Sequence, residues 1–173
     1  MPSYSKTMIF IDGSNFYFSL KKSFNKTNID FKKFAKFLVG NNELIKLFYY
    51  NAPLNRKENE EEYRKQQKFF NYLNNLDIIQ MYYGRLERRP DGHKSEKGVD
   101  VKLAIDLIIN SYHNNFDIAI LVSNDADFIP AIKEIQNQGK KVYNVSFKNT
   151  KSYNLNKVCN YTIMVDSIDD LLK

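Results

Sequence analysis

Apolar and polar residues alternate in short blocks along the chain, and these blocks predict strands and helices in turn. Compact apolar runs, rich in β-branched and aromatic residues, predict strands at residues 7–11, 44–50, 78–83, 118–122, 141–147 and 161–165. Apolar residues at helical spacing predict helices at 15–24, 31–39, 58–74, 99–110, 128–138 and 151–159, with a last turn at 167–172. Residues 84–98 have few apolar side chains and contain a Pro-Asp-Gly turn, which predicts a mobile loop.

This alternation is typical of α/β proteins, in which a mostly parallel sheet carries helices on both faces. We expect a single domain over residues 1–173, with its core at about 7–165. Ligands of such sheets bind beyond the carboxyl ends of the strands, near the point where the strand order reverses. Residues that directly follow a strand are therefore candidates for a functional site.

Acidic residues follow two of the predicted strands. Asp12 ends the first strand, and Asp125 and Asp127 follow the strand at residues 118–122. If these two strands are neighbours, which is usual at a switch point, the carboxylates converge at one edge of the sheet. Asp100 is a further candidate, because it shares a helix face with Leu103 and heads a stripe that should face the core. A carboxylate buried there needs a cation beside it.

Each acid also has a structural explanation when it is considered alone. Asp12 suits a turn or the N-cap of the helix at Asn15, Asp100 favours the helix dipole, and Asp127 suits the N-cap of the helix that begins at Phe128. Asp125 has the weakest structural explanation of the group. None of these roles explains why several acids are predicted at the same edge of one sheet.

Clustered carboxylates are suited to hard divalent cations such as Mg²⁺ or Mn²⁺, which bind oxygen ligands and substrate phosphates. Such sites hydrolyse phosphodiesters. Haloacid-dehalogenase phosphatases need Asp at position 14, which is Ser14, and integrin-type metal sites need Ser at position 16, which is Phe16. Nucleotide-binding glycine motifs are absent from the sequence, and the histidines, His93 and His113, are isolated, which argues against a nucleotide cofactor and a zinc site.

Composition narrows the class of partner. The net charge of +6 favours polyanions, although a lysine-rich surface alone also explains it. A mean hydropathy of -0.53 excludes an integral membrane protein. The single cysteine, Cys159, suits a reducing cytoplasm, where we expect the protein to act.

Residues 10–15 (FIDGSN), 97–104 (KGVDVKLA) and 123–128 (SNDADF) together resemble the signature segments of NYN domains, which belong to the PIN-like nuclease superfamily. The resemblance extends from residue 8 to about residue 165. It implies a Rossmann-like three-layer α/β/α sandwich with a mostly parallel sheet of about five to six strands, a divalent-metal site and ribonuclease activity. One departure is that many relatives have Gly at positions 124 and 126, which are Asn124 and Ala126 here.

The resemblance also assigns roles by position. Asp12, Asp100 and Asp125 resemble the metal-binding catalytic acids, with Asp127 as a fourth. Asn15 and Ser123 match polar positions beside the metal, and Lys97 is placed to meet a phosphate.

The loop at residues 84–98 gives independent support for a nucleic-acid partner. Its basic residues are Arg85, Arg88, Arg89, Lys94 and Lys97. The tyrosines at the ends of two strands, Tyr49, Tyr50, Tyr82 and Tyr83, can stack on bases while the basic residues hold phosphates. Packing of the tyrosines and a simply solvated loop are the alternatives.

The leading hypothesis is a Mg²⁺- or Mn²⁺-dependent endoribonuclease that hydrolyses RNA with a metal-activated water. A non-catalytic RNA-binding or regulatory module that keeps the acidic pocket is the second hypothesis, and a phosphatase or other hydrolase on a Rossmann-like scaffold is the third. The RNA target and the oligomeric state are left open by the sequence, and a homodimer is compatible with it.

Overall fold

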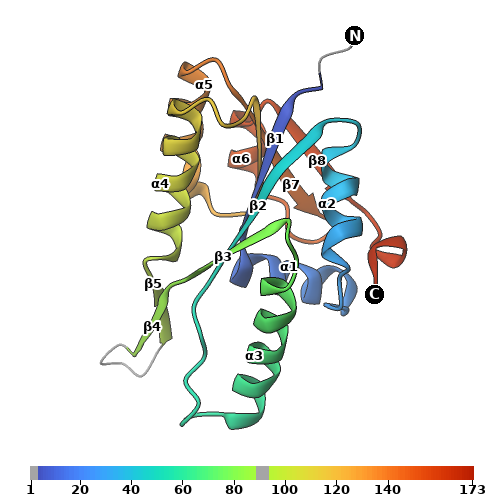
Figure 1. The fold of residues 1–173 in the computed structure, drawn as a ribbon, viewed down its shortest axis with the longest axis vertical. Coiled ribbons are helices and arrows are strands. Elements are labelled where there is room, and N and C mark those ends of the chain that lie inside the picture. Colours follow the sequence, from blue (N-terminus) through green and yellow to red (C-terminus); the bar gives the residue numbers. More distant parts are fainter. Residues whose placement is uncertain (1–3, 89–93) are drawn as a thin grey trace.

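The computed structural model describes residues 4–88 and 94–173, and it places a parallel sheet at the centre of the molecule (Figure 1). The strands of this sheet are β1 (Lys6–Asp12), β2 (Glu43–Asn51), β3 (Ile79–Tyr83), β6 (Ile118–Val122), β7 (Lys141–Phe147) and β8 (Tyr161–Val165). They lie in the order β3-β2-β1-β6-β7-β8, and every neighbouring pair is parallel. The predicted strands and the predicted sheet class are confirmed.

Helices cover both faces of the sheet. They are α1 (Gly13–Phe24), α2 (Phe31–Val39), α3 (Glu60–Asn74), α4 (Val99–Tyr112), α5 (Ile129–Asn137) and α6 (Tyr153–Val158), with short 3₁₀ turns η1 (Ala126–Phe128) and η2 (Asp169–Leu171). In Figure 1, α4, α5 and α6 lie on one side of the sheet and α1, α2 and α3 on the other. The three-layer α/β/α sandwich expected from the sequence is therefore confirmed.

Alternate side chains of the central strand β1 pack in two separate cores, because successive side chains of a strand point to opposite faces of the sheet. Ile9 and Ile11 of β1 pack in one core with residues of α1, α2 and α3. Met8 and Phe10 pack in the other core with residues of α4, α5 and α6. Burial on both faces explains why β1 and β6 read as continuous apolar runs in the sequence.

The strand order reverses between β1 and β6. Their register pairs Ile11 with Val122, so the residues that follow these two strands emerge side by side at the carboxyl edge of the sheet. The predicted neighbourhood of the two acid-bearing strands is therefore confirmed, and it lies at the switch point where α/β sheets bind ligands.

The segment at residues 84–98, predicted as a mobile loop, contains regular structure that the sequence pattern did not indicate. The chain forms an antiparallel pair of strands there, β4 (Arg85–Arg88) and β5 (Lys94–Lys97), in which Arg85 pairs with Lys97 and Leu86 with Glu96. Backbone pairing stabilises this hairpin. Its side chains are mostly polar, so the sequence lacks the alternation of apolar and polar residues that would have predicted strands. The predicted Pro-Asp-Gly turn lies outside the described residues.

None of the helices in the described ranges combines the length and the apolar character needed to cross a membrane.

Candidate active site

Asp12 lies at the end of β1, and its side chain is only 6% exposed. Its Oδ1 accepts a hydrogen bond from the backbone N–H of Asn15 at 3.1 Å, so it caps α1 as the sequence suggested. Its Oδ2 accepts a hydrogen bond from the hydroxyl of Ser123 at 3.2 Å. Both oxygens are thus oriented by groups from the two strand ends that meet at the switch point.

Burial raises the pKa of Asp12 from its ordinary value of 3.8 to about 7. The negative charges of Asp100 and Glu96 raise it further, while the hydrogen bonds from Asn15 and Ser123 act in the opposite direction. A carboxyl group in this state holds a proton near neutral pH unless a cation takes its place.

The prediction that Asp100 is buried at the head of a core-facing stripe is wrong, because the residue is exposed. It lies in the first turn of α4, where Val99 takes the buried position instead. The pKa of Asp100 is nevertheless raised, first by partial burial of its carboxyl group and then by the charges of Asp125 and Asp127. These mutual effects show that acids from β1, α4 and the turn after β6 are close to one another.

The helix cap after β6 differs from the predicted one. The side chain of Asp125, and not that of Asp127, is the cap: it accepts a hydrogen bond from the backbone N–H of Asp127 at 2.9 Å and starts η1. The helix α5 then begins after Phe128 without a side-chain cap. The 3₁₀ turn shifts the cap two residues upstream, and it leaves the Asp127 side chain exposed beside Asp100.

Asn15 and Ser123 connect the strand ends rather than facing open solvent. The Oδ1 of Asn15 accepts a hydrogen bond from the backbone N–H of Asn124 at 3.1 Å. The hydroxyl oxygen of Ser123 accepts one from the backbone N–H of Asp125 at 3.2 Å while its proton goes to Asp12. These residues therefore hold the acidic turn against the end of β1.

Asn124 and Ala126 stand where the resemblance led us to expect glycine, and the Oδ1 of Asn124 is buried without a hydrogen-bond partner in the described part of the chain. The Asn124 side chain donates from Nδ2 to the Ser19 hydroxyl on α1 at 3.0 Å. Among the described residues, Asn25 and Asn114 are the non-glycine positions with a positive φ, so neither position 124 nor position 126 requires glycine. The backbone at both positions has an ordinary conformation.

Glu96 is a site residue that sequence reasoning missed. It accepts a hydrogen bond from the hydroxyl of Ser14, at the start of α1. Burial raises its pKa, which the Ser14 hydrogen bond lowers and the Asp100 charge raises. The sequence placed Glu96 in a charged loop, and its hydrogen bond from Ser14 and its electrostatic effect on Asp12 show that it lies near the acids.

The oxygens of these residues are the ligand type that Mg²⁺ and Mn²⁺ prefer, and burial, with smaller effects of the Asp100 and Glu96 charges, raises the pKa of Asp12. Within residues 4–88 and 94–173, however, no three acidic, histidine or cysteine side chains are placed to hold one ion as they stand. Asp100 and Asp127 are exposed, so their side chains have room to turn toward a shared ion. The donor chemistry fits a divalent cation.

The tyrosines at the strand ends divide into two groups. Tyr49 and Tyr50 are buried: the Tyr49 hydroxyl donates to the Gly13 carbonyl at 3.4 Å, and the Tyr50 hydroxyl donates to Asp106 at 2.9 Å. Packing is their role, as the alternative reading held. Tyr83 remains 42% exposed at the end of β3.

Several predicted substrate-binding residues meet at a hollow of about 260 Å³ between β3 and the base of the hairpin. Its lining residues are Tyr82, Tyr83, Gly84, Arg85, Lys97 and Gly98. Arg88 belongs to β4, and Arg89 lies outside the described residues.

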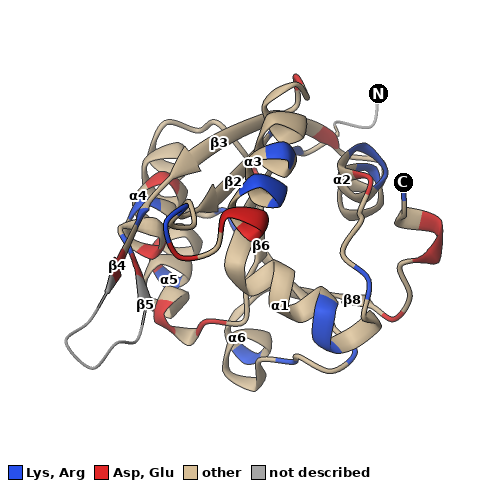
Figure 2. Cartoon of the chain, turned by 90° about the horizontal axis from the view of Figure 1, so that it is seen from below, with Lys and Arg blue, Asp and Glu red and all other residues tan. Residues whose placement is uncertain are grey.

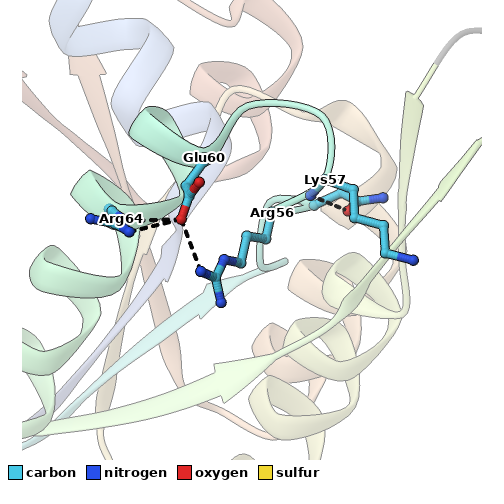
Figure 3. A network of polar contacts seen from close by, with 5 residues as sticks. Arg56, Lys57, Glu60 and Arg64 are labelled. Atoms are coloured by element: carbon cyan, nitrogen blue, oxygen red, sulfur yellow. Dashed lines mark hydrogen bonds and ion pairs between the residues drawn. The ribbon is translucent and has the colours of Figure 1, made fainter.

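A basic segment lies beside the hairpin at the same edge, in the loop between β2 and α3 (Figures 1 and 2). Arg56 and Arg64 both donate to Oε1 of Glu60, at 2.9 and 2.8 Å, and the amino group of Lys57 points away from this cluster (Figure 3). One carboxylate therefore pairs with two guanidinium groups, while Glu61 and Glu62 in the same turn of α3 both pair with Lys65.

Comparisons with known proteins agree with this architecture. A crystal structure of a protein of unknown function, VPA0982 from Vibrio parahaemolyticus, superposes with a TM-score of 0.77 at 24% identity and covers 100% of this chain and 99% of that one. That likeness concerns the fold. The uncharacterized protein MJ0482 of Methanocaldococcus jannaschii is 34% identical over 67 residues, which are 39% of this chain and 28% of that protein.

The match with MJ0482 thus spans less than a third of that relative's length. A family model covers far more of the chain: the NYN domain matches residues 6–166. This range contains β1 and the turn after β6, and with them every acid of the candidate site. The chain belongs to the NYN domain family.

Proposed function

We propose that the protein is a Mg²⁺- or Mn²⁺-dependent endoribonuclease whose catalytic acids are Asp12, Asp100 and Asp125, with Asp127 beside them. The NYN family lies within the PIN-like nuclease superfamily, which makes a nuclease the expected class. The observation that carries the proposal is Asp12 itself. A buried carboxyl group with a pKa of about 7, surrounded by further acids at a switch point, costs stability and suits a bound cation.

The chain's own residues perform the positioning. The Asn15 N–H and the Ser123 hydroxyl hold the Asp12 carboxylate in one orientation. Asp100 and Asp127 are exposed, so they could help hold a cation between the acids and a phosphodiester at the edge of the sheet. When bound, a divalent cation supplies charge neutralisation at the scissile phosphate and activation of the attacking water.

Positive groups around the acids are suited to the rest of the substrate. Lys97 and Arg85 lie at the base of the hairpin, and Lys57 lies on the loop before α3. Cations that flank an acidic centre can hold neighbouring phosphates of a polynucleotide while the centre acts on one of them. Contacts to phosphates carry no sequence information, so we propose an RNA substrate without a fixed sequence.

The test is cleavage of single-stranded and structured RNA with Mg²⁺, with Mn²⁺ and with chelator. Asp12→Asn and Asp125→Asn should lower kcat/KM by about 100-fold or more, the loss typical when a group that stabilises transition-state charge is removed. Asp169→Asn is the matched control, since Asp169 is an exposed acid on η2 that forms an ion pair with Lys26. Equal cleavage by wild type and Asp12→Asn in Mn²⁺ would refute the proposal.

A non-catalytic RNA-binding module is a second candidate. It is favoured by the spacing of the acids, which in the described part of the chain does not form a ready three-ligand site. Salt-dependent RNA binding without turnover in either metal would support this candidate.

A further inference from the structure

We propose that the hollow between β3 and the hairpin binds one unpaired base of a nucleic-acid strand, stacked on Tyr83, while Lys97 holds the adjoining phosphate. The proposal rests on the polynucleotide substrate of the proposed function, and the tests below separate the two. It assigns a subsite at a place distinct from the acids.

The hollow is built by close approach of backbone segments. A Cβ added to Gly84 would come within 2.5 Å of the Val99 side chain and 2.8 Å of the Lys97 carbonyl. Gly98 has a φ of +81°, a conformation that favours glycine, and it starts α4. The chain therefore enters the hairpin at Gly84 and leaves it at Gly98 in close contact with α4, and both glycines line the hollow.

Tyr83 has the properties of a stacking platform. Its hydroxyl accepts a hydrogen bond from Asn74 Nδ2 at 2.6 Å, and its ring lies 5.3 Å from that of Phe70 between centroids. These contacts with α3 hold the ring, while the residue stays 42% exposed. A fixed, partly exposed aromatic ring stacks on a base without losing much conformational freedom.

The hairpin register places Arg85 and Lys97 on the same face of the hairpin. Arg85 and Lys97 are direct partners across the antiparallel pair, so their side chains leave the same face of the hairpin. The next pair, which contains Glu96, points to the opposite face, where Glu96 meets Ser14. The base in the hollow is therefore a neighbour of the nucleotide that is cleaved, and not the cleaved nucleotide itself.

Charge pairing distinguishes the two cations. Arg85 Nε donates to Glu87 at 2.8 Å, which neutralises much of its charge. Lys97 makes no ion pair with any residue that the structure describes, so its amino group is available to a phosphate.

The volume of the hollow suits a single base. Its volume of about 260 Å³ is below the range of about 300–1,000 Å³ in which pockets enclose a whole small molecule. One base ring fits this space, whereas a complete nucleotide cofactor would extend out of it. A base must also be unpaired to enter, which favours single-stranded substrate.

The first test measures binding of a fluorescent single-stranded RNA octamer by anisotropy, with chelator present so that no cleavage occurs. Tyr83→Ala should weaken binding about 5- to 150-fold, the loss of one stacked base. Tyr83→Phe should retain binding because it keeps the ring. Tyr161→Ala is the matched control, since Tyr161 is an exposed tyrosine on the opposite edge strand, β8.

A set of octamers with one abasic position each makes the test specific. Wild type should lose affinity when one particular base is missing, and Tyr83→Ala should show no further loss with that octamer. Lys97→Gln should reduce the slope of log affinity against log salt by about 0.7, as expected for one phosphate contact to a single strand. Binding by Tyr83→Ala within twofold of wild type, or equal losses at every abasic position, would overturn the proposal.

Cleavage assays then separate this subsite from the proposed function. If wild type cleaves RNA and Tyr83→Ala loses kcat/KM mainly through KM, both proposals stand. If wild type binds with the expected Tyr83 dependence and cleaves nothing in either metal, the subsite stands and the nuclease fails. If RNA is cleaved but the kinetics of Tyr83→Ala and Tyr161→Ala are the same, the subsite fails alone.

Discussion

Replacing Asp12 with Asn should make the metal-free protein more stable, although the substitution removes the central acid of the site. Asn keeps the shape of Asp and an oxygen that can accept the hydrogen bond from the Asn15 N–H. Its amide group faces the Ser123 oxygen, which is able to accept a hydrogen bond. The substitution therefore removes a buried charge and keeps the cap of α1.

The magnitude follows from the pKa of Asp12, which is about 7 in the folded protein against an ordinary value of 3.8. The unfolded chain loses this proton from pH 3.8 upward, and the folded chain only near pH 7, so the free energy of unfolding falls between these values. With about 1.36 kcal/mol per pKa unit, the raised pKa lowers the free energy of unfolding, relative to a neutral side chain, by about 4 kcal/mol at pH 8 and about 2 kcal/mol at pH 5. These are large fractions of a domain's stability.

Urea unfolding followed by circular dichroism measures this effect, with chelator present and at several pH values from 5 to 8. The unfolding free energy of Asp12→Asn should exceed that of wild type, and the difference should be largest at pH 8. Added Mn²⁺ should stabilise wild type more than the variant, because a ligand of the folded state alone raises its stability. Asp169→Asn should show no such gain, since the pKa of Asp169 is lowered by its hydrogen bond from Lys26.

Two results would refute this reasoning. One is a variant that is no more stable than wild type at pH 8 in chelator. The other is a stability difference of the same size at pH 5 and pH 8, since a buried charge predicts a pH-dependent difference.

Three further predictions follow from contacts near the site. Gly13→Ala should lower the unfolding free energy by about 1–3 kcal/mol, because its Cβ would lie 2.5 Å from Tyr49 Cε1; urea unfolding measures this loss, and wild-type stability would contradict it. Ser14→Ala should speed amide hydrogen exchange in β5, because it removes the hydrogen bond to Glu96; unchanged exchange would show that this contact does not anchor the hairpin. Cys159 should react with thiol reagents only after unfolding, because burial raises its pKa to about 12, and rapid labelling of the native protein would contradict this.

Elements with a strong local signal were predicted with nearly correct bounds. The strands β6, β7 and β8 begin and end at the expected residues, because each is a dense apolar run between polar turns. The cap of α1 by Asp12 was one of the two local roles expected of that residue, and it is confirmed. In each case the residues that decide the structure are close in sequence.

Predictions that rested on helical periodicity alone succeeded less well around the site. Asp100 matches the apolar stripe of α4 by spacing, yet it is exposed, and helical periodicity alone does not show this. The cap before α5 moved from Asp127 to Asp125, because a 3₁₀ turn precedes the helix and periodicity does not distinguish the two helix types.

The sequence by itself determined the parallel α/β architecture and the set of acids that follow the strands. Both depend on patterns repeated within a few residues, which the backbone geometry of strands and helices imposes. Tertiary structure alone decided which groups meet. Pairing of β1 with β6 brought Ser123 to Asp12, and the hairpin brought Glu96 to Ser14 and Lys97 to Tyr83. These groups are far apart in sequence, so their proximity, and the raised pKa of Asp12, arise only once the chain has folded.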